Sequence, residues 1–255
     1  MTQLGAQMFT VREFTKDTEG LLETFRKLRA IGYEAVQVSA IGAGIPVQDV
    51  AEGLKENGLT CAATHISFDD CKRDLDAVIA KHKAWDCEYV GVGMMPEEYR
   101  ADAAGLERFA REASDVADGL AKAGLKFVYH NHNFEFRKFD GKVGMDILFD
   151  NSSRNFQFEI DTFWVQKGGA DVRAWIDKVR GRMDVVHFKD MALNDKAEQI
   201  MAEIGQGNLN WDGIIASCRD IGVKWYLVEQ DDCHGRDPFE SLKMSYEYLT
   251  AKGVK

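Results

Sequence analysis

The segment YHNHNFEF, residues 129–136, gathers side chains that can do chemistry into one short stretch. His130 and His132 are two of only six histidines in the chain, and they follow the apolar run LKFV. Side chains repeat every two residues along a strand, so both imidazoles would face the same side. Imidazoles bind metal ions and exchange protons near neutral pH. The segment therefore predicts a reactive site where a buried strand ends.

Three later apolar runs, FEIDTFW, VVHFKD and LVEQDD, also end in residues that can bind a metal ion. With the segment above, they supply one candidate from each of four consecutive strands: Glu135, Asp161, His187 and Glu229. Oxygen-rich sites with one nitrogen suit Mn²⁺ or Mg²⁺, with Co²⁺ or Zn²⁺ as alternatives. We therefore predict one divalent ion bound by these four residues.

Other polar and aromatic residues are expected to line the same site. A substrate-binding role is predicted for five of them: Gln7, His65, Glu159, Trp164 and Gln206. Gln206 lies in the triplet Gly-Gln-Gly, which could be a turn or a backbone approach to substrate. His82 and His234 are expected at the surface, and the pair Met94 and Met95 in the core.

A recurring pattern indicates what positions these residues. An amphipathic stretch ends near a glycine and a short β-rich run follows, as in LKENGLTCAATHIS and LAKAGLKFVYHNH. Glycines at such places are typical of helix ends. In residues 101–123, apolar side chains recur at steps of three and four, which predicts one buried helix face. The last helix is expected to begin at Pro238, with Asp237 as its N-cap.

The β-rich runs predict eight strands, at residues 4–9, 33–39, 59–65, 87–93, 125–131, 155–161, 183–188 and 224–229. Alternating strands and helices imply a parallel sheet. Eight such units in 255 residues predict a single-domain α/β fold, the closed (β/α)8 TIM barrel, spanning residues 1–255. An open doubly wound sheet is the alternative. It would usually show G-x-G-x-x-G after the first strand, and FTVREFT there has no glycine.

The composition limits which binding partners and which cellular compartment are expected. The net charge of −10 would repel a phosphate backbone, so nucleic acid is not expected as a partner. The five cysteines show no C-x-x-C pair and are read as reduced thiols, which suits a cytoplasmic protein. No apolar run approaches membrane-spanning length, and the first residues lack the pattern of a signal peptide. No membrane association is expected.

Five segments in order, YHNHNFEF, FEIDTFWVQKGG, VVHFKDM, IGQGNLNW and WYLVEQDD, make the chain resemble a known family over nearly its whole length. These are the xylose isomerase-like barrels known as sugar phosphate isomerases/epimerases. The family includes ketose epimerases and isomerases, inosose dehydratases, enzymes of 3-keto sugars and the endonuclease IV group. The resemblance implies a divalent ion bound by Glu, Asp, His and Glu on the last four barrel strands.

The resemblance assigns Asp161, His187 and Glu229 as ligands on strands six, seven and eight. Strand five leaves two alternatives open. Glu135 reaches back to the metal, which we favour, or a histidine of YHNH is the fourth ligand and Glu135 contacts substrate. Trp164 departs from the family pattern, because several ketose epimerases carry a substrate-binding histidine at this position.

The predicted reaction is isomerisation or epimerisation of a keto sugar or sugar derivative through an enediolate. Glu135 and Glu229 are the predicted acid/base pair, with His130 or His132 as alternatives and Lys189 positioned to hold an oxyanion. A lyase or dehydratase acting on a keto sugar, 3-keto glycoside or keto inositol shares the first step. An endonuclease IV-like nuclease is a remote alternative. A homodimer is the expected assembly.

Overall fold

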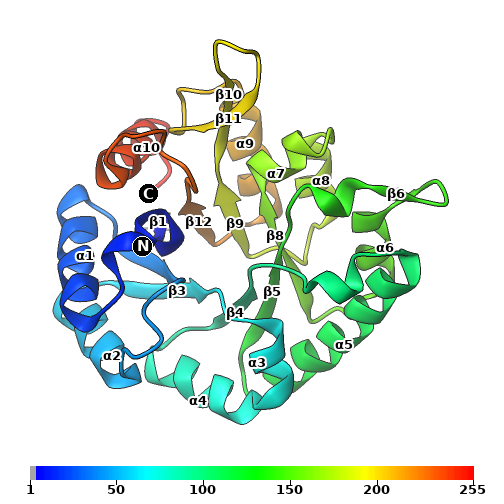
Figure 1. The fold of residues 1–255 in the computed structure, drawn as a ribbon, viewed down its shortest axis with the longest axis horizontal. Helices are drawn as coiled ribbons and strands as arrows, with labels where there is room; N and C mark the ends of the chain where they lie inside the picture. The colour runs from blue at the N-terminus through cyan, green and yellow to red at the C-terminus, as the bar shows by residue number, and fades with distance from the viewer. Residues whose placement is uncertain (1–3) are drawn as a thin grey trace.

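Short buried strands alternate with amphipathic helices along the whole chain, and the strands curl into a barrel that the helices surround (Figure 1). The computed structural model describes residues 4–255. The barrel strands are β1 Leu4–Gln7, β2 Ala35–Val38, β3 Thr60–Thr64, β4 Tyr89–Val92, β5 Lys126–His130, β8 Phe156–Asp161, β9 Val185–Phe188 and β12 Trp225–Val228. Each lies inside one of the eight predicted ranges, so the TIM barrel prediction is confirmed.

The sheet runs in the order β3-β2-β1-β12-β9-β8-β5-β4, and its paired strands are parallel. One isolated bridge, between Ile66 and Val92, joins the two ends of this order just beyond β3. The Ile66 amide donates to the Gly91 carbonyl at 2.9 Å. A Cβ on Gly91 would lie 2.1 Å from the Thr64 carbonyl oxygen, so only glycine fits this seam. The barrel is therefore nearly closed.

Helices and short hairpins fill the connections. The α-helices are α1 Thr18–Ile31, α2 Val47–Glu56, α3 Phe68–Arg73, α4 Leu75–Ala84, α5 Ala103–Lys122, α6 Gly144–Asn151, α7 Thr162–Lys167, α8 Val172–Lys178, α9 Trp211–Ile221 and α10 Pro238–Ala251. The 3₁₀ helices are η1 Met8–Phe14, η2 Glu97–Tyr99 and η3 Phe134–Phe136. Two hairpins stand outside the barrel: β6 Lys138–Phe139 with β7 Lys142–Val143, and β10 Asp190–Leu193 with β11 Gln199–Ala202.

The start of α10 and the buried face of α5 agree with the sequence predictions. Asp237 accepts hydrogen bonds from the first amides of α10, which begins at Pro238. The predicted face of α5 is buried: Leu106, Phe109, Ala113, Val116 and Leu120. Tyr33 donates from its hydroxyl to the Leu242 carbonyl at 2.9 Å, which ties the start of the barrel to the last helix. All five cysteines are free thiols. Within residues 4–255, no helix is both long and apolar enough to cross a membrane.

Alternation along the strands separates two buried regions. In β2, Val36 and Val38 pack in the large core shared with the helices, whereas Ala35 belongs to a small cluster in the barrel interior. That interior cluster also contains Val128 from β5 and Leu227 from β12. Residues two positions further along each strand, toward its C-terminal end, form the next interior layer. This layer is polar and carries the site described below.

Two of the expected placements are wrong. His82 is fully buried rather than at the surface, because it lies on the face of α4 that packs against β3. Its Nδ1 donates to the Val78 carbonyl at 2.7 Å, so its Nε2 accepts from the Thr64 hydroxyl at 2.7 Å. Met94 is 49% exposed, whereas its neighbour Met95 is fully buried as expected. His234 is exposed, as predicted.

Burial lowers the pKa of His82 to about 4, below the value of about 6.5 for an unfolded chain. The unfolded state then binds the extra proton first, so stability is full above pH 6.5 and falls as the pH drops toward 4. We expect the wild type to lose about 2 kcal/mol more unfolding free energy than His82→Gln between pH 7.5 and pH 5. Urea unfolding at both pH values measures this difference. Parallel losses in the two proteins would contradict the prediction.

Candidate functional site

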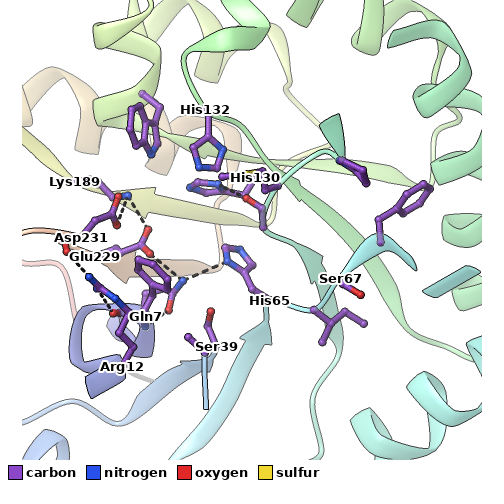
Figure 2. Close-up of a pocket in the computed structure, with 18 of the residues that line it drawn as sticks. Gln7, Arg12, Ser39, His65, Ser67, His130, His132, Lys189, Glu229 and Asp231 are labelled. Atoms are coloured by element: carbon purple, nitrogen blue, oxygen red, sulfur yellow. Dashed lines mark hydrogen bonds and ion pairs between the residues drawn. The ribbon is translucent and has the colours of Figure 1, made fainter. Parts of the chain in front are cut away.

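Four successive barrel strands deliver metal-binding side chains to one point at the C-terminal end of the barrel. These residues, called the donor cluster below, are His130, Asp161, His187 and Glu229. Each offers a nitrogen or oxygen that lies within 4.8 Å of the other three, and all four residues are buried. His130 and Glu229 also line a cavity above the cluster (Figure 2).

Hydrogen bonds fix which ring nitrogen each histidine presents to the cluster. His130 Nδ1 donates to the Gly93 carbonyl at 3.1 Å, which leaves Nε2. His187 Nε2 donates to Gln37 Oε1 at 2.6 Å, which leaves Nδ1. The amide of Gln37 has only one consistent orientation, because its Nε2 donates to Glu159 Oε1 at 2.9 Å. Both histidines therefore turn an unprotonated nitrogen toward the cluster when they are neutral.

The unprotonated nitrogens face carboxylates. His130 Nε2 lies 3.1 Å from Asp161 Oδ2, and His187 Nδ1 lies 3.0 Å from Glu229 Oε2. The lone pairs in such pairs repel each other unless a proton or a metal ion lies between them. The buried His187 Nδ1 and Glu229 Oε2 also lack any hydrogen bond of good geometry. Such a donor set fits a divalent metal ion, with the distal nitrogens held in the way metal-binding histidines usually are.

A second layer of side chains surrounds the donor cluster and is called the support ring: Gln7, His65, Glu159 and Gln37. Gln7 Nε2 donates to Glu229 Oε1 at 3.0 Å and to His65 Nδ1 at 3.3 Å. His65 Nε2 then donates to Glu159 Oε2 at 2.6 Å. Glu159 also accepts from Gln37, which in turn accepts from His187. The support ring therefore connects Glu229 to His187 through an unbroken series of hydrogen bonds.

The field of these carboxylates favours positive charge. Burial acts against the charged ring of His187, but Glu159 and Glu229 outweigh it and raise the pKa of His187 to about 10. Burial likewise acts against the ionised carboxyl of Glu159, yet the His187 and His65 rings hold its pKa well below the usual range. A cation at this position is therefore electrostatically favoured.

Lys189 lies at the edge of the donor cluster and is almost fully buried. Its Nζ lies 3.2 Å from Asp161 Oδ2, 2.9 Å from Glu229 Oε2 and 3.0 Å from Asp231 Oδ1. Burial opposes the charge, but the three carboxylates hold the pKa of Lys189 above its ordinary value. The ammonium group also lies 5.6 Å from the centre of the Trp164 ring.

The cavity above the cluster has a volume of about 760 Å³. Of the residues with a predicted role, Gln7, His65, His130, His132, Trp164, Lys189 and Glu229 line it. Burial, with His130 and Lys189 nearby, lowers the pKa of His132 to about 2, so its ring is neutral. Its Nδ1 is buried without a hydrogen-bond partner. Glu159 does not line the cavity and instead holds its place in the support ring.

Glu135 does not join the donor cluster. Its carboxylate accepts from the Tyr129 hydroxyl at 2.6 Å and from the His132 amide at 3.0 Å. It is fully buried, and burial raises its pKa to about 7. The physical reason is its place on η3, beyond the end of β5, where it closes the loop back on Tyr129. His130, the last residue of β5, occupies the position in the cluster that Glu135 was expected to fill.

Gln206 is also placed away from the cavity and is exposed. The glycines on either side of it serve a different purpose. Asp190 Oδ2 accepts from the Gly205 amide at 2.9 Å, the Gly207 amide at 3.1 Å and the Trp211 indole at 2.7 Å. The triplet therefore wraps a buried carboxylate and fixes the loop that precedes α9.

The sequence reading missed Gln37 and gave no role to Asp231. Gln37 left a signal, since it is the one polar residue in the buried strand AVQV and its side chain points into the barrel. Asp231 lines the cavity and pairs with Lys189. Burial, and then Glu229, raise the pKa of Asp231 to about 6.

The fold agrees with a comparison against known protein families. Residues 25–251 match the xylose isomerase-like TIM barrel family. The chain belongs to this family. None of the curated proteins matches the chain. The family match covers all four residues of the donor cluster, although it does not assign them a role.

Solved structures with the same fold span nearly the whole chain. A sugar phosphate isomerase/epimerase from Parabacteroides distasonis ATCC 8503 has a TM-score of 0.82, 22% identity and 98% coverage of both chains. An L-ribulose 3-epimerase has a TM-score of 0.76 and 17% identity, covering 100% of this chain and 95% of its own. An IOLI protein with a bound zinc atom has a TM-score of 0.73 and 13% identity, covering 100% and 98%. At these identities the likeness shows the fold alone.

Asp190 gives a test of how the loop beside the site is held. Asp190→Ala removes the acceptor of several buried donors, each of which costs about 1–3 kcal/mol when unsatisfied. We expect a loss of at least about 3 kcal/mol in unfolding free energy, measured by urea unfolding. Asp212→Ala is the matched control, because Asp212 is exposed and pairs only with Lys252 at the surface. Equal effects of the two substitutions would contradict the assignment.

Proposed function

We propose that this chain is a metal-dependent isomerase or epimerase of a keto sugar or sugar derivative. One observation carries the proposal: the donor cluster forms the floor of a cavity that also presents proton-transfer groups and a buried ammonium group. Membership of the xylose isomerase-like family supports it, as do neighbouring structures named for isomerases and epimerases. The substrate is a small molecule that enters the open end of the barrel.

The residues proposed to hold the metal are His130, Asp161, His187 and Glu229, in place of the set with Glu135. Two imidazoles and two carboxylates suit Zn²⁺, Co²⁺ or Mn²⁺ better than Mg²⁺, which prefers oxygen ligands alone. When bound, the ion would polarise a substrate carbonyl as a Lewis acid. The support ring orients Glu229 through Gln7, and His187 through Gln37.

Proton transfer is assigned to Glu229 and His132. Glu229 Oε2 makes ionic contacts with Lys189 and His187, and His132 Nδ1 has no partner at all. Both residues line the cavity, and Figure 2 shows them on different parts of its wall. Glu229 is ionised and the His132 ring is neutral, so either group can remove the proton from the carbon beside the substrate carbonyl. The group that took the proton is then the acid that returns it to the enediolate.

Lys189 is assigned to stabilise the oxygen that gains negative charge when the proton leaves. Its ammonium group is fixed by Asp161, Glu229 and Asp231, so it needs no reorganisation during the reaction. Trp164 lies against it and shields this side of the cavity from water. A fixed, buried cation stabilises developing charge far more than a hydrated one.

An elimination on the same keto sugar is the second candidate, and one feature favours it. Asp231 lines the cavity beside Lys189 and carries no ligand role, and its pKa of about 6 lets it exchange a proton near neutral pH, so the site holds one more proton-transfer group than a simple isomerisation requires. Elimination shares the first proton removal and then expels a group from the β carbon. The mass of the product separates the two reactions, because an isomer keeps the mass of its substrate.

Proton removal beside a carbonyl can be detected before the substrate is known. We expect the metal-loaded protein to exchange deuterium from heavy water into a member of a keto sugar panel, followed by NMR. Asp161→Ala/His187→Ala should lose this exchange by at least about a hundredfold, because the cluster no longer binds a metal ion. Mass spectrometry of the same samples distinguishes isomerised from eliminated products. Exchange at equal rates in both proteins would refute the enolising mechanism.

Metal titration tests which residue of the fifth barrel strand is the ligand. We expect His130→Ala to lose stoichiometric binding of Zn²⁺ or Mn²⁺, whereas Glu135→Gln retains about one ion per chain. The reason is that His130 Nε2 faces the cluster and the Glu135 carboxylate is held by Tyr129. The opposite result would restore Glu135 as the ligand.

The same titration measures the support ring. Gln37→Leu should weaken metal binding by about 10–100-fold, because the His187 ring loses the acceptor that fixes its tautomer. Gln48→Leu is the matched control. Gln48 bonds only to Glu52 at the exposed surface of α2. Similar affinities of the two variants would show that the ring does not position His187.

A further inference from the structure

The cavity has two walls of opposite chemistry. The wall formed by β5, β8, β9 and β12 carries the donor cluster, Lys189 and Asp231. The wall beyond β3 and β4 is apolar and is called the apolar shelf: Ile66, Phe68, Met94 and Pro96. Figure 2 shows Ser67, which lies between two shelf residues in the sequence, across the cavity from Lys189 and Asp231. One cavity thus joins a charged reaction centre to a wall with a large apolar share, where Asp69 is the charged residue.

Among the described residues that line the cavity, the cationic side chains are Lys189 and Arg12. Lys189 is held by three carboxylates. Arg12 donates from Nη1 to the Phe9 carbonyl at 2.8 Å and from Nη2 to the Asp231 carbonyl at 3.1 Å. Its guanidinium also lies 4.2 Å from the centre of the Phe9 ring. Lys189 is therefore surrounded by negative charge, whereas Arg12 keeps N–H donors beyond the two that these carbonyl groups accept.

Carboxylates make a phosphate still less favourable. Asp69, Glu229 and Asp231 line the cavity together with these two cations, so the lining is not positive overall. Phosphate recognition usually relies on bidentate arginines, lysines with free donors or backbone amides at a helix N-terminus. Two short helices begin beside the shelf, α3 with six residues and η2 with three, and neither is long enough to provide a strong N-terminal site.

Met94 supplies the second observation. It is 49% exposed at the cavity, although large apolar side chains are usually buried. Its neighbour Met95 is fully buried, so the two adjacent methionines differ in exposure. A flexible, polarisable side chain left at a cavity wall suits contact with an apolar or aromatic group of a ligand. The volume of about 760 Å³ is that of a site for a drug-sized ligand and exceeds what a single sugar ring fills.

Building on the proposed function, we propose that the substrate is an unphosphorylated glycoside: a keto sugar joined to an apolar aglycone of ring size. The sugar ring lies over the donor cluster, with its carbonyl near Lys189. The aglycone lies on the apolar shelf and removes Ile66 and Met94 from water. Binding energy from the aglycone orients the sugar, which carries the reacting carbon.

Equilibrium binding of unreactive glycosides tests this proposal. The ligands are p-nitrophenyl and methyl β-glycosides of glucose, galactose and xylose, together with glucose 6-phosphate and galactose 6-phosphate. Isothermal titration of the native, metal-supplemented protein should show at least one p-nitrophenyl glycoside binding about tenfold or more tightly than its methyl counterpart. Each sugar phosphate should bind more weakly than the methyl glycoside of the same sugar.

Variants locate the preference on the shelf. Met94→Ser should lower the affinity for the p-nitrophenyl glycoside about three- to tenfold and leave the methyl glycoside unchanged, and Met94→Leu should restore it. Leu193→Ser is the matched control, since Leu193 is 54% exposed but lies on the β10 hairpin away from the cavity lining. Leu193→Ser should change neither affinity.

The proposal is overturned if a sugar phosphate binds most tightly, if Met94→Ser has no selective effect, or if no glycoside of the panel binds. These outcomes are independent of the proposed reaction, because the ligands carry no carbonyl and binding requires no proton removal. Absence of a metal ion and of deuterium exchange would refute the proposed function even if the aglycone preference were observed. A preference for phosphate with normal deuterium exchange would refute only the glycoside assignment.

Discussion

The requirement to neutralise buried negative charge governs the open end of this barrel. Asp161 and Glu229 each turn an oxygen toward a histidine nitrogen, and each pair is stable only when a proton or a metal ion lies between its two atoms. Ionised carboxylates cannot be left alone in a buried site, because the cost of desolvation is large. Lys189 supplies one positive charge, and a divalent ion would supply the rest. The support ring, the orientation of two amides and the tautomers of the histidines all follow from this requirement.

The barrel brings these charged and polar groups together because every second side chain of a strand points inward. Inward side chains on each strand rise in layers, from small apolar residues such as Ala35 and Val128 to polar residues at the C-terminal end. Gln37, His187 and Glu159 therefore arrive at one height from strands that are far apart in the sequence. Backbone hydrogen bonds between neighbouring strands fix their register and so fix this height. Regular geometry thus substitutes for any local sequence motif around the site.

Much of this architecture could be predicted from the sequence, because it depends on local patterns. Each of the eight β-rich runs became a barrel strand, and Asp161, His187 and Glu229 came together as alternation requires. Glu135 could not be placed, because it lies on a loop whose path is set by a hydrogen bond to Tyr129. His82 was misplaced because a helix of weak amphipathicity does not reveal which face it buries. Gln37 was missed because its partners, His187 and Glu159, lie more than a hundred residues away.

The seam between β3 and β4 is held by fewer backbone hydrogen bonds than the rest of the barrel. Elsewhere neighbouring strands share a ladder of backbone hydrogen bonds, but here a single bridge at Ile66 and a glycine without room for a side chain join the barrel ends. Local opening costs less where fewer bonds must break. The seam borders the apolar shelf and lies away from the strands that carry Asp161 and Glu229. Local opening of the barrel is therefore easiest beside the apolar shelf, on the side away from Asp161 and Glu229.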